Sequence, residues 1–223
     1  MNRSISSLQG LRAIGAIMIF IHHYCDVSDI TEALGDCGVT WFMTLSGFVL
    51  SAAYSDRINR IDIRQFIIRR FKRIAPIYYF SLFMMLAIYY HATGLKALVA
   101  SLLMIQSWFS ESRIFISLNW PSWFISDLMF CSLLFIPLNR LFTKQRKWLW
   151  LVIAIGVIAY FTTVAVTPAD MTLYWIYIFP PMQLASFVAG MLLVQVASRW
   201  RWAKPTPPQA NILIISAFAL VAV

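Results

Sequence analysis

Long apolar runs recur along the whole chain, and they constrain its fold more than any other feature of the sequence. Of the 223 residues, 61% are hydrophobic and only 12% are charged, whereas a soluble domain typically carries about 25% charged residues. A chain with so little charge cannot cover its own surface for water. We therefore predict an all-α, polytopic transmembrane bundle, because helices satisfy their own backbone hydrogen bonds inside a bilayer.

Most of the apolar runs have a length near that of a membrane span, which takes about 17–25 residues. The eight runs cover residues 8–25, 36–54, 74–92, 97–109, 121–138, 148–166, 172–197 and 210–223. A cleaved signal peptide is not expected, because the first run contains Arg12 and no small-residue cleavage site follows it. The last run ends without polar flanks. We therefore expect residues 1–223 to form a single membrane domain that is incomplete, with its last helix cut off.

Basic residues cluster between the runs and predict the orientation of the chain. One of them is Arg3, and the others lie in the segments 55–73, 139–147 and 198–208. Positively charged loops face the cytoplasm, so the N-terminus and these segments should be cytoplasmic. An even number of crossings must then separate the segments 55–73 and 139–147. The run 97–109 should therefore not cross, and we expect it to be re-entrant or to lie at the outer face beside a cavity.

The net charge of +9 has the same explanation. The basic residues lie in short loops between apolar runs and form no nucleic-acid-binding motif, so we expect no nucleic-acid partner. The three cysteines, Cys25, Cys37 and Cys131, lack the spacing of metal ligands. We therefore expect no metal site. A disulfide between Cys25 and Cys37 stays open, and we do not predict one.

Two polar side chains in the first run, Arg12 and His23, raise the question of function. In a helix they differ in phase by about 20° and lie about 16 Å apart along the axis. His22 lies about 80° away from Arg12. An ionisable residue inside a membrane indicates a functional site by default, but a snorkelling arginine and an interfacial histidine give the same pattern. Spacing alone leaves both interpretations open.

Five motifs add to this pattern when they are taken in order. They read "SLQGLRAIGAIMIFIHH", "GDCGVTWFMTLSGFVLS", "FIIRRFKRIAPIYYFSLF", "WPSWFISDLMF" and "FPPMQLASFVAGMLL". Over residues 5–197 this series resembles membrane-bound acyltransferase family 3, typified by bacterial O-acetyltransferases of surface polysaccharides. The family pattern has an Arg and a His in the first helix with ten residues between them. Later it has an Arg-x-x-Arg cluster before an Arg-Ile-x-Pro-x-Tyr segment, and then a Trp-Ser-Leu-x-x-Glu segment.

The resemblance implies that His23 is the catalytic histidine and that Arg12 is its motif partner. An imidazole can take a proton from an acceptor hydroxyl or carry the acyl group covalently, and the sequence leaves both routes open. Asp127 stands where the family pattern has Glu, one methylene shorter. A buried carboxylate needs a partner, so we expect Asp127 to orient His23 or to pair with Arg12.

The resemblance also implies a donor site on the cytoplasmic side. Arg70 and Arg73 form the Arg-x-x-Arg pair, and Arg69 lies beside them. Guanidinium groups pair well with phosphate oxygens, so these three arginines are expected to bind acyl-CoA. We expect the following helix to start near Pro76. Ordinary anchoring of a cytoplasmic loop stays an open alternative.

The function that the resemblance implies is O-acyl transfer in the bacterial inner membrane. The donor would be acyl-CoA, with acetyl-CoA as the favoured case, and the acceptor a hydroxyl of a cell-surface glycan. The partners would then be acyl-CoA, the glycan and membrane lipid. Gln183 and Ser186 stand where the family often has Arg and an acid, so an inactive relative stays open as an alternative. A transporter with a path through Arg12, His23 and Asp127 stays open as another.

Overall fold

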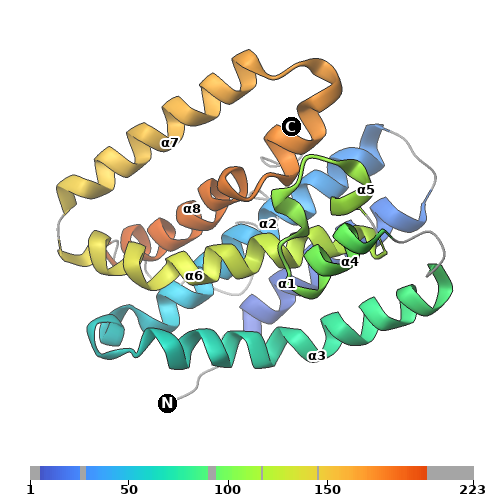
Figure 1. The fold of residues 1–223 in the computed structure, drawn as a ribbon. Helices are drawn as coiled ribbons and strands as arrows, with labels where there is room; N and C mark the ends of the chain where they lie inside the picture. Colours follow the sequence, from blue (N-terminus) through green and yellow to red (C-terminus); the bar gives the residue numbers. More distant parts are fainter. Residues whose placement is uncertain (1–5, 26–28, 90–93, 117, 145, 200–223) are drawn as a thin grey trace. The chain divides into compact units, whose positions relative to one another are not determined.

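Helices make up all the regular structure in the part of the chain that the computed structural model describes (Figure 1). The described residues are 6–25, 29–89, 94–116, 118–144 and 146–199. Within them, the helices long and apolar enough to cross a membrane are Ala33–Arg60, Ile63–Tyr89 and Trp120–Thr143. A bent pair, Ala169–Ile178 and Pro180–Val194, adds a fourth if the two form one span. The prediction of an all-α fold with several membrane-spanning helices is confirmed, and the predicted run 210–223 lies outside the described residues.

The described chain divides into two compact units. The first unit consists of the residues up to Ala52 and the residues from Ser186 onward. The second unit is Ala53–Ala185. The first unit contains α1 (Ser6–Tyr24) and most of α2 (Asp29–Tyr54). It also contains most of α8 (Pro180–Arg199).

Glycines allow α1 and α2 to approach each other closely. A Cβ on Gly15 would lie 3.0 Å from the Trp41 ring, and a Cβ on Gly38 would lie 2.7 Å from the Ile19 side chain. The indole Nε1 of Trp41 donates a hydrogen bond to the Leu11 carbonyl oxygen, at 3.0 Å. The two helices therefore pack with little space between them.

α2 and α8 cross at two glycines in the same unit. A Cβ on Gly47 would overlap with the carbonyl group of Phe187, and a Cβ on Gly190 would overlap with that of Thr44. Near this crossing the Ser51 hydroxyl donates to a backbone carbonyl of α8, at 3.3 Å. Such backbone-to-backbone contact is the role of small residues in membrane helix pairs. The stretch "LSGF" at residues 45–48, which contains Gly47, therefore serves helix packing here.

In the second unit, α3 (Ile63–Tyr89) follows a 3₁₀ helix, η1 (Ser55–Arg60), and begins earlier than we predicted. A helix start near Pro76 is wrong, because α3 includes the basic residues from position 64 onward and Pro76 lies inside it. Asp62 provides the physical reason. Its carboxylate oxygen accepts hydrogen bonds from two amides of the first turn, at 2.8 and 3.3 Å, which is the role of an N-cap residue.

α6 (Trp123–Lys144) packs along α3 in the opposite direction (Figure 1). It follows the 3₁₀ turn η4 (Trp120–Ser122). Arg70 in the first half of α3 bonds to Ser132 well inside α6. The second half of α3 therefore lies beside the start of α6.

The run 97–109 does not form a long helix. It contains most of α4 (Leu95–Leu102), which has only eight residues, and the 3₁₀ turn η3 (Gln106–Trp108). Met104 between them has a φ of 55°, a left-handed conformation that ends helical geometry. A single turn, α5 (Ser112–Phe115), follows. The helical part of this run is therefore shorter than a membrane span, and its location at the outer face stays a prediction.

The last elements of the second unit are α7 (Arg146–Val166), the 3₁₀ turn η5 (Ala169–Met171) and the π-helix η6 (Leu173–Ile178). Large apolar side chains on α7 are exposed, as expected for a surface that contacts lipid. η6 meets α8 at a bend of 43°. The apolar run 172–197 therefore forms two helices, with the break at Pro180.

Candidate functional site

α1 carries Arg12, His22 and His23 on one uninterrupted helix. Because α1 is continuous from Ser6 to Tyr24, the helical phase that we predicted between Arg12 and His23 applies to it. The side chain of Arg12 is half-buried and that of His23 is exposed. The catalytic roles that the resemblance implies for both residues stay predictions.

His22 packs against α2, a contact that the sequence did not indicate. A Cβ on Gly35 would lie 2.5 Å from Cγ of the His22 ring, so the imidazole lies directly on the backbone of α2. The rings of His22 and His23 meet edge to face, with centroids 4.8 Å apart. The position of His23 is therefore tied to α2 through its neighbour.

Asp127 is fully buried on α6, in the second unit. Neither of its carboxylate oxygens has a hydrogen-bond partner among the described residues. The Ser107 hydroxyl lies close enough to interact with it, but it donates to the Ser126 hydroxyl, at 2.6 Å. A buried acceptor without a donor costs about 1–3 kcal/mol, and more when it is charged. Because His23 and Asp127 belong to different units, their pairing stays a prediction.

Gln106 forms a second buried polar group beside the start of α6. Its side-chain amide donates to the Ser122 carbonyl oxygen, at 2.9 Å, and to the hydroxyl of Tyr78, at 3.3 Å. A carbonyl oxygen only accepts hydrogen bonds, so the nitrogen of Gln106 must face Ser122. Its Oε1 is then left buried without a donor. Gln106 and Asp127 therefore present unpaired acceptors in one region of the second unit.

The three predicted donor-binding arginines differ in their surroundings. Arg70 is half-buried, and its Nε and Nη2 both donate to the Ser132 hydroxyl, at 3.3 and 3.2 Å. Arg69 is exposed, and its Nε donates to a carbonyl of its own helix, at 3.2 Å. Arg73 is also exposed. Of the three, Arg70 is the one held against α6, the helix that carries Asp127.

The polar groups of the second unit lie at successive positions along α6. At 1.5 Å per residue, Asp127 lies about 10 Å from Trp120, where η4 begins, and about 8 Å from Ser132, which binds Arg70. The carboxylate is thus between the basic half of α3 and the end of the unit near α4 and α5. Ser107 and Gln106 join it from η3.

Sequence reasoning missed Gln106, Ser107 and the contact of His22. The available signal was the polar pair Gln106–Ser107 inside the apolar stretch "MIQSWF", because polar groups at membrane depth are costly unless they are satisfied or functional. The contact of His22 left no such signal. No group of three His, Cys, Asp or Glu side chains suited to a metal ion occurs among the described residues.

Comparison with known families decides the class of the protein. An acyltransferase domain, that of acyltransferase family 3, matches residues 5–223. The chain belongs to acyltransferase family 3. The resemblance predicted from the five motifs is therefore confirmed.

A curated relative of this family 3 member is the acyltransferase MdmB of Streptomyces mycarofaciens. The two are 27% identical over 252 aligned residues. The match covers 98% of the chain but spans only 64% of the relative's length. No solved structure matches the chain.

Proposed function

We propose that this family 3 acyltransferase transfers an acyl group, acetyl in the favoured case, from acyl-CoA to a hydroxyl of a cell-surface carbohydrate. The observation that carries the proposal is the full burial of the Asp127 carboxylate, whose oxygens have no well-formed hydrogen bond with the described residues although the Ser107 hydroxyl lies near. On α6 this carboxylate lies between Ser132, which binds Arg70, and the turn η4. Such a carboxylate lowers stability. We infer that it is retained because a partner meets it during catalysis.

The proposed reaction places His23 as the base. Its imidazole takes the proton of the acceptor hydroxyl while the hydroxyl oxygen attacks the thioester carbonyl. The carbon–sulfur bond then breaks, and the imidazolium returns the proton to the CoA thiolate. The products are an ester and free CoA. If His23 carries the acyl group covalently first, the same bonds are exchanged in two steps and the products are the same.

The other residues support this step. Asp127 orients the His23 ring and stabilises the imidazolium, as a carboxylate does beside a catalytic histidine. Arg12 stabilises the negative charge that develops on the carbonyl oxygen, or holds a phosphate of the donor. Arg69, Arg70 and Arg73 bind the phosphates of acyl-CoA.

The proposed location is the bacterial inner membrane, with the N-terminus in the cytoplasm. Arg70 and its basic neighbours then face the cytoplasm, where acyl-CoA is found. The end of α3 near Tyr89 faces outward, where the acceptor glycan is found. The positive-inside rule supports this orientation.

The test is a measurement of O-acyl esters on the surface glycans of the native host. Glycans from cells that express the full chain are analysed by mass spectrometry before and after mild alkali. We expect a base-labile acyl group with the wild-type protein and its loss with His23→Ala. His91→Ala, which removes the remaining histidine outside the His22–His23 pair, is the control and should leave the ester in place.

The opposite result has a clear meaning. If ester levels do not differ between the wild type, His23→Ala and cells without the protein, acyl transfer to surface glycans is excluded. A solute that crosses the membrane unchanged in the same cells would then indicate the transporter alternative. The absence of both would indicate an inactive relative.

A further inference from the structure

A pocket of about 670 Å³ opens within the second unit, where the end of α3 meets α4, α5 and η4. Its walls include Tyr89 from α3, Lys96 from α4, and Glu111, Arg113 and Trp120 from the segment between α4 and α6. We call it the α3–α5 pocket. Its volume lies within the range of about 300–1,000 Å³ that small-molecule sites occupy.

The charged groups of the α3–α5 pocket leave one positive charge uncompensated. Lys96 Nζ and Glu111 Oε1 form an ion pair at 2.6 Å, so their charges cancel. Arg113 forms no ion pair and no hydrogen bond with any residue that the structure describes. A free guanidinium presents a planar set of donors that matches a carboxylate or a phosphate. The pocket therefore favours a ligand with a single anionic group.

Aromatic side chains form the rim of the α3–α5 pocket. Trp120 is 59% exposed and Tyr89 is 51% exposed. Leu118, with a φ of 59°, turns the backbone just before Trp120, while its side chain packs on the buried cluster around Tyr78. Large aromatic faces offer apolar contact area for a flat ligand, and the CH face of a pyranose ring is such a ligand.

The Glu111 carboxylate favours a polyhydroxylated ligand over a lipid headgroup. Tryptophan, tyrosine and basic residues also gather where membranes meet water, so a lipid headgroup is the competing candidate. The Glu111 carboxylate, whose charge Lys96 compensates, accepts hydrogen bonds from hydroxyl groups, and a sugar ring offers several of them. A wall with an acceptor, an ammonium and a free guanidinium fits a polyhydroxylated molecule with one acidic group better than a phospholipid.

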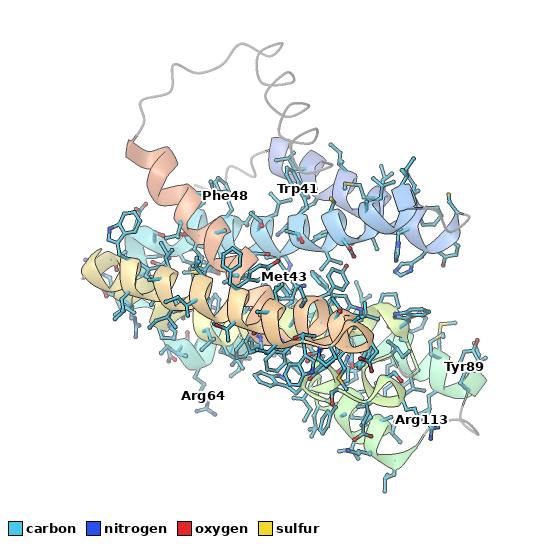
Figure 2. The ribbon with its side chains drawn as sticks, turned by 90° about the horizontal axis from the view of Figure 1, so that it is seen from above. Trp41, Met43, Phe48, Arg64, Tyr89 and Arg113 are labelled. Carbon is cyan, nitrogen blue, oxygen red and sulfur yellow. The ribbon has the colours of Figure 1, made fainter. Side chains whose placement is uncertain are left out.

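The α3–α5 pocket lies at the opposite end of α3 from the basic cluster. Tyr89 follows Arg70 by 19 positions, which is about 28 Å along a helix. Figure 2 shows Tyr89 and Arg113 together at one end of this unit and Arg64 projecting from another part of it. The pocket is therefore remote from the proposed acyl-CoA site and lies on the side from which an acceptor would enter.

We propose that the α3–α5 pocket binds an acidic sugar of the acceptor glycan. Arg113 pairs with the carboxylate of the sugar, Trp120 stacks on the ring, and the Lys96–Glu111 pair binds its hydroxyl groups. This inference rests on the proposed function, since it names the class of acceptor: a glycan that contains a uronic acid or a related acidic residue.

The test is a binding titration of the full chain in nanodiscs, measured by calorimetry without an acyl donor. The probes are a disaccharide that contains glucuronic acid and the matched glucose disaccharide. We expect the acidic probe to bind at least tenfold more tightly to the wild type, and Arg113→Gln to remove this preference. Arg64→Gln removes the same charge elsewhere on α3, and it should preserve the preference. Glu111→Gln frees Lys96 from its ion pair and should enlarge the preference for the acidic probe.

Two results would overturn the inference. One is equal affinity of the wild type for both disaccharides, or a preference that Arg113→Gln leaves intact. The other is loss of sugar binding when phosphatidylglycerol replaces neutral lipid in the nanodisc, because the pocket would then be a lipid site. The titration needs no acyl transfer, so it measures binding independently of catalysis. Failure of binding with intact ester formation would therefore contradict only the pocket assignment.

Discussion

The imidazole of His22 lies against the backbone of α2 at Gly35. A Cβ on Gly35 would be 2.5 Å from Cγ and 2.6 Å from Nδ1 of that ring. The ring of His22 in turn meets the ring of His23 edge to face. Residue 35 therefore controls the position of His22 and, through it, the position of the proposed base.

Gly35→Ala should lower the rate of acyl transfer at least about tenfold, because a displacement of about 1 Å in a catalytic group costs up to about a hundredfold. Gly38→Ala is the matched control, one turn further along α2. Its Cβ would meet Cγ1 of Ile19, at 2.7 Å, and not a histidine ring, so we expect a loss of about 1–3 kcal/mol in stability without the loss of rate. Initial rates and thermal unfolding of both purified variants make the comparison. Equal loss of rate in the two would show that His22 has no special role.

Asp127 should contribute to activity at the expense of stability. Asp127→Leu removes the unpaired buried acceptors and keeps most of the volume, so we expect the free energy of unfolding to rise by about 1–3 kcal/mol. The same variant should lose acyl transfer by about a hundredfold or more, the usual contribution of a positioned acid–base system. Chemical denaturation in detergent and initial rates provide the two measurements. A variant that unfolds more easily would reveal a partner of Asp127 in the resting protein.

Gly47 and Gly190 should tolerate no side chain. Either substitution by alanine places a methyl group on a backbone carbonyl of the facing helix, and overpacking of this kind costs about 1–3 kcal/mol or more. Gly156→Ala is the control, because nothing lies within 4 Å of its Cβ position and alanine favours a helix over glycine by about 1 kcal/mol. We expect the first two variants to lower the unfolding temperature and the third to keep or raise it. Unchanged unfolding of Gly47→Ala would contradict the close crossing of α2 and α8.

Arg70 should matter more for the donor than Arg69. We expect Arg70→Gln to raise KM for acyl-CoA about tenfold or more, since a charge-assisted hydrogen bond contributes about 1.5–3 kcal/mol. Arg69→Gln removes an exposed arginine bonded within its own helix and should have a much smaller effect. Ser132→Ala releases the side chain of Arg70 from α6 and should raise KM in the same direction as Arg70→Gln. Equal effects of Arg69→Gln and Arg70→Gln would indicate an unspecific basic surface instead.

The membrane helices were predictable because hydropathy is a local property. The runs 36–54, 74–92 and 121–138 each correspond to a long helix of the structure. The start of α3 was not predictable from hydropathy, since its first turns are basic and only the cap at Asp62 shows that they are helical. Charge density indicated a loop there, and local backbone hydrogen bonding decided otherwise.

The sequence predicted only those candidate site residues that belong to a motif or share a helical face. Helical phase relates Arg12 to His23, and motif order led to Asp127. Contacts between segments distant in the sequence were not predictable in this way. Gln106 reaches Ser122 only because η3 folds onto the start of α6, and His22 meets Gly35 only because α1 and α2 pack closely. Neither contact leaves a periodic trace in the sequence.

The most direct test of the central claim uses membrane vesicles that hold the full chain with its cytoplasmic face outward. Acyl-CoA labelled with ¹³C in the acyl group is supplied on that side, and labelled O-acyl ester and free CoA are both quantified. We predict equal molar amounts of ester and free CoA with the wild type, and neither above background with His23→Ala. Release of free CoA without ester, or ester formation that persists in His23→Ala, would contradict acyl transfer by this histidine.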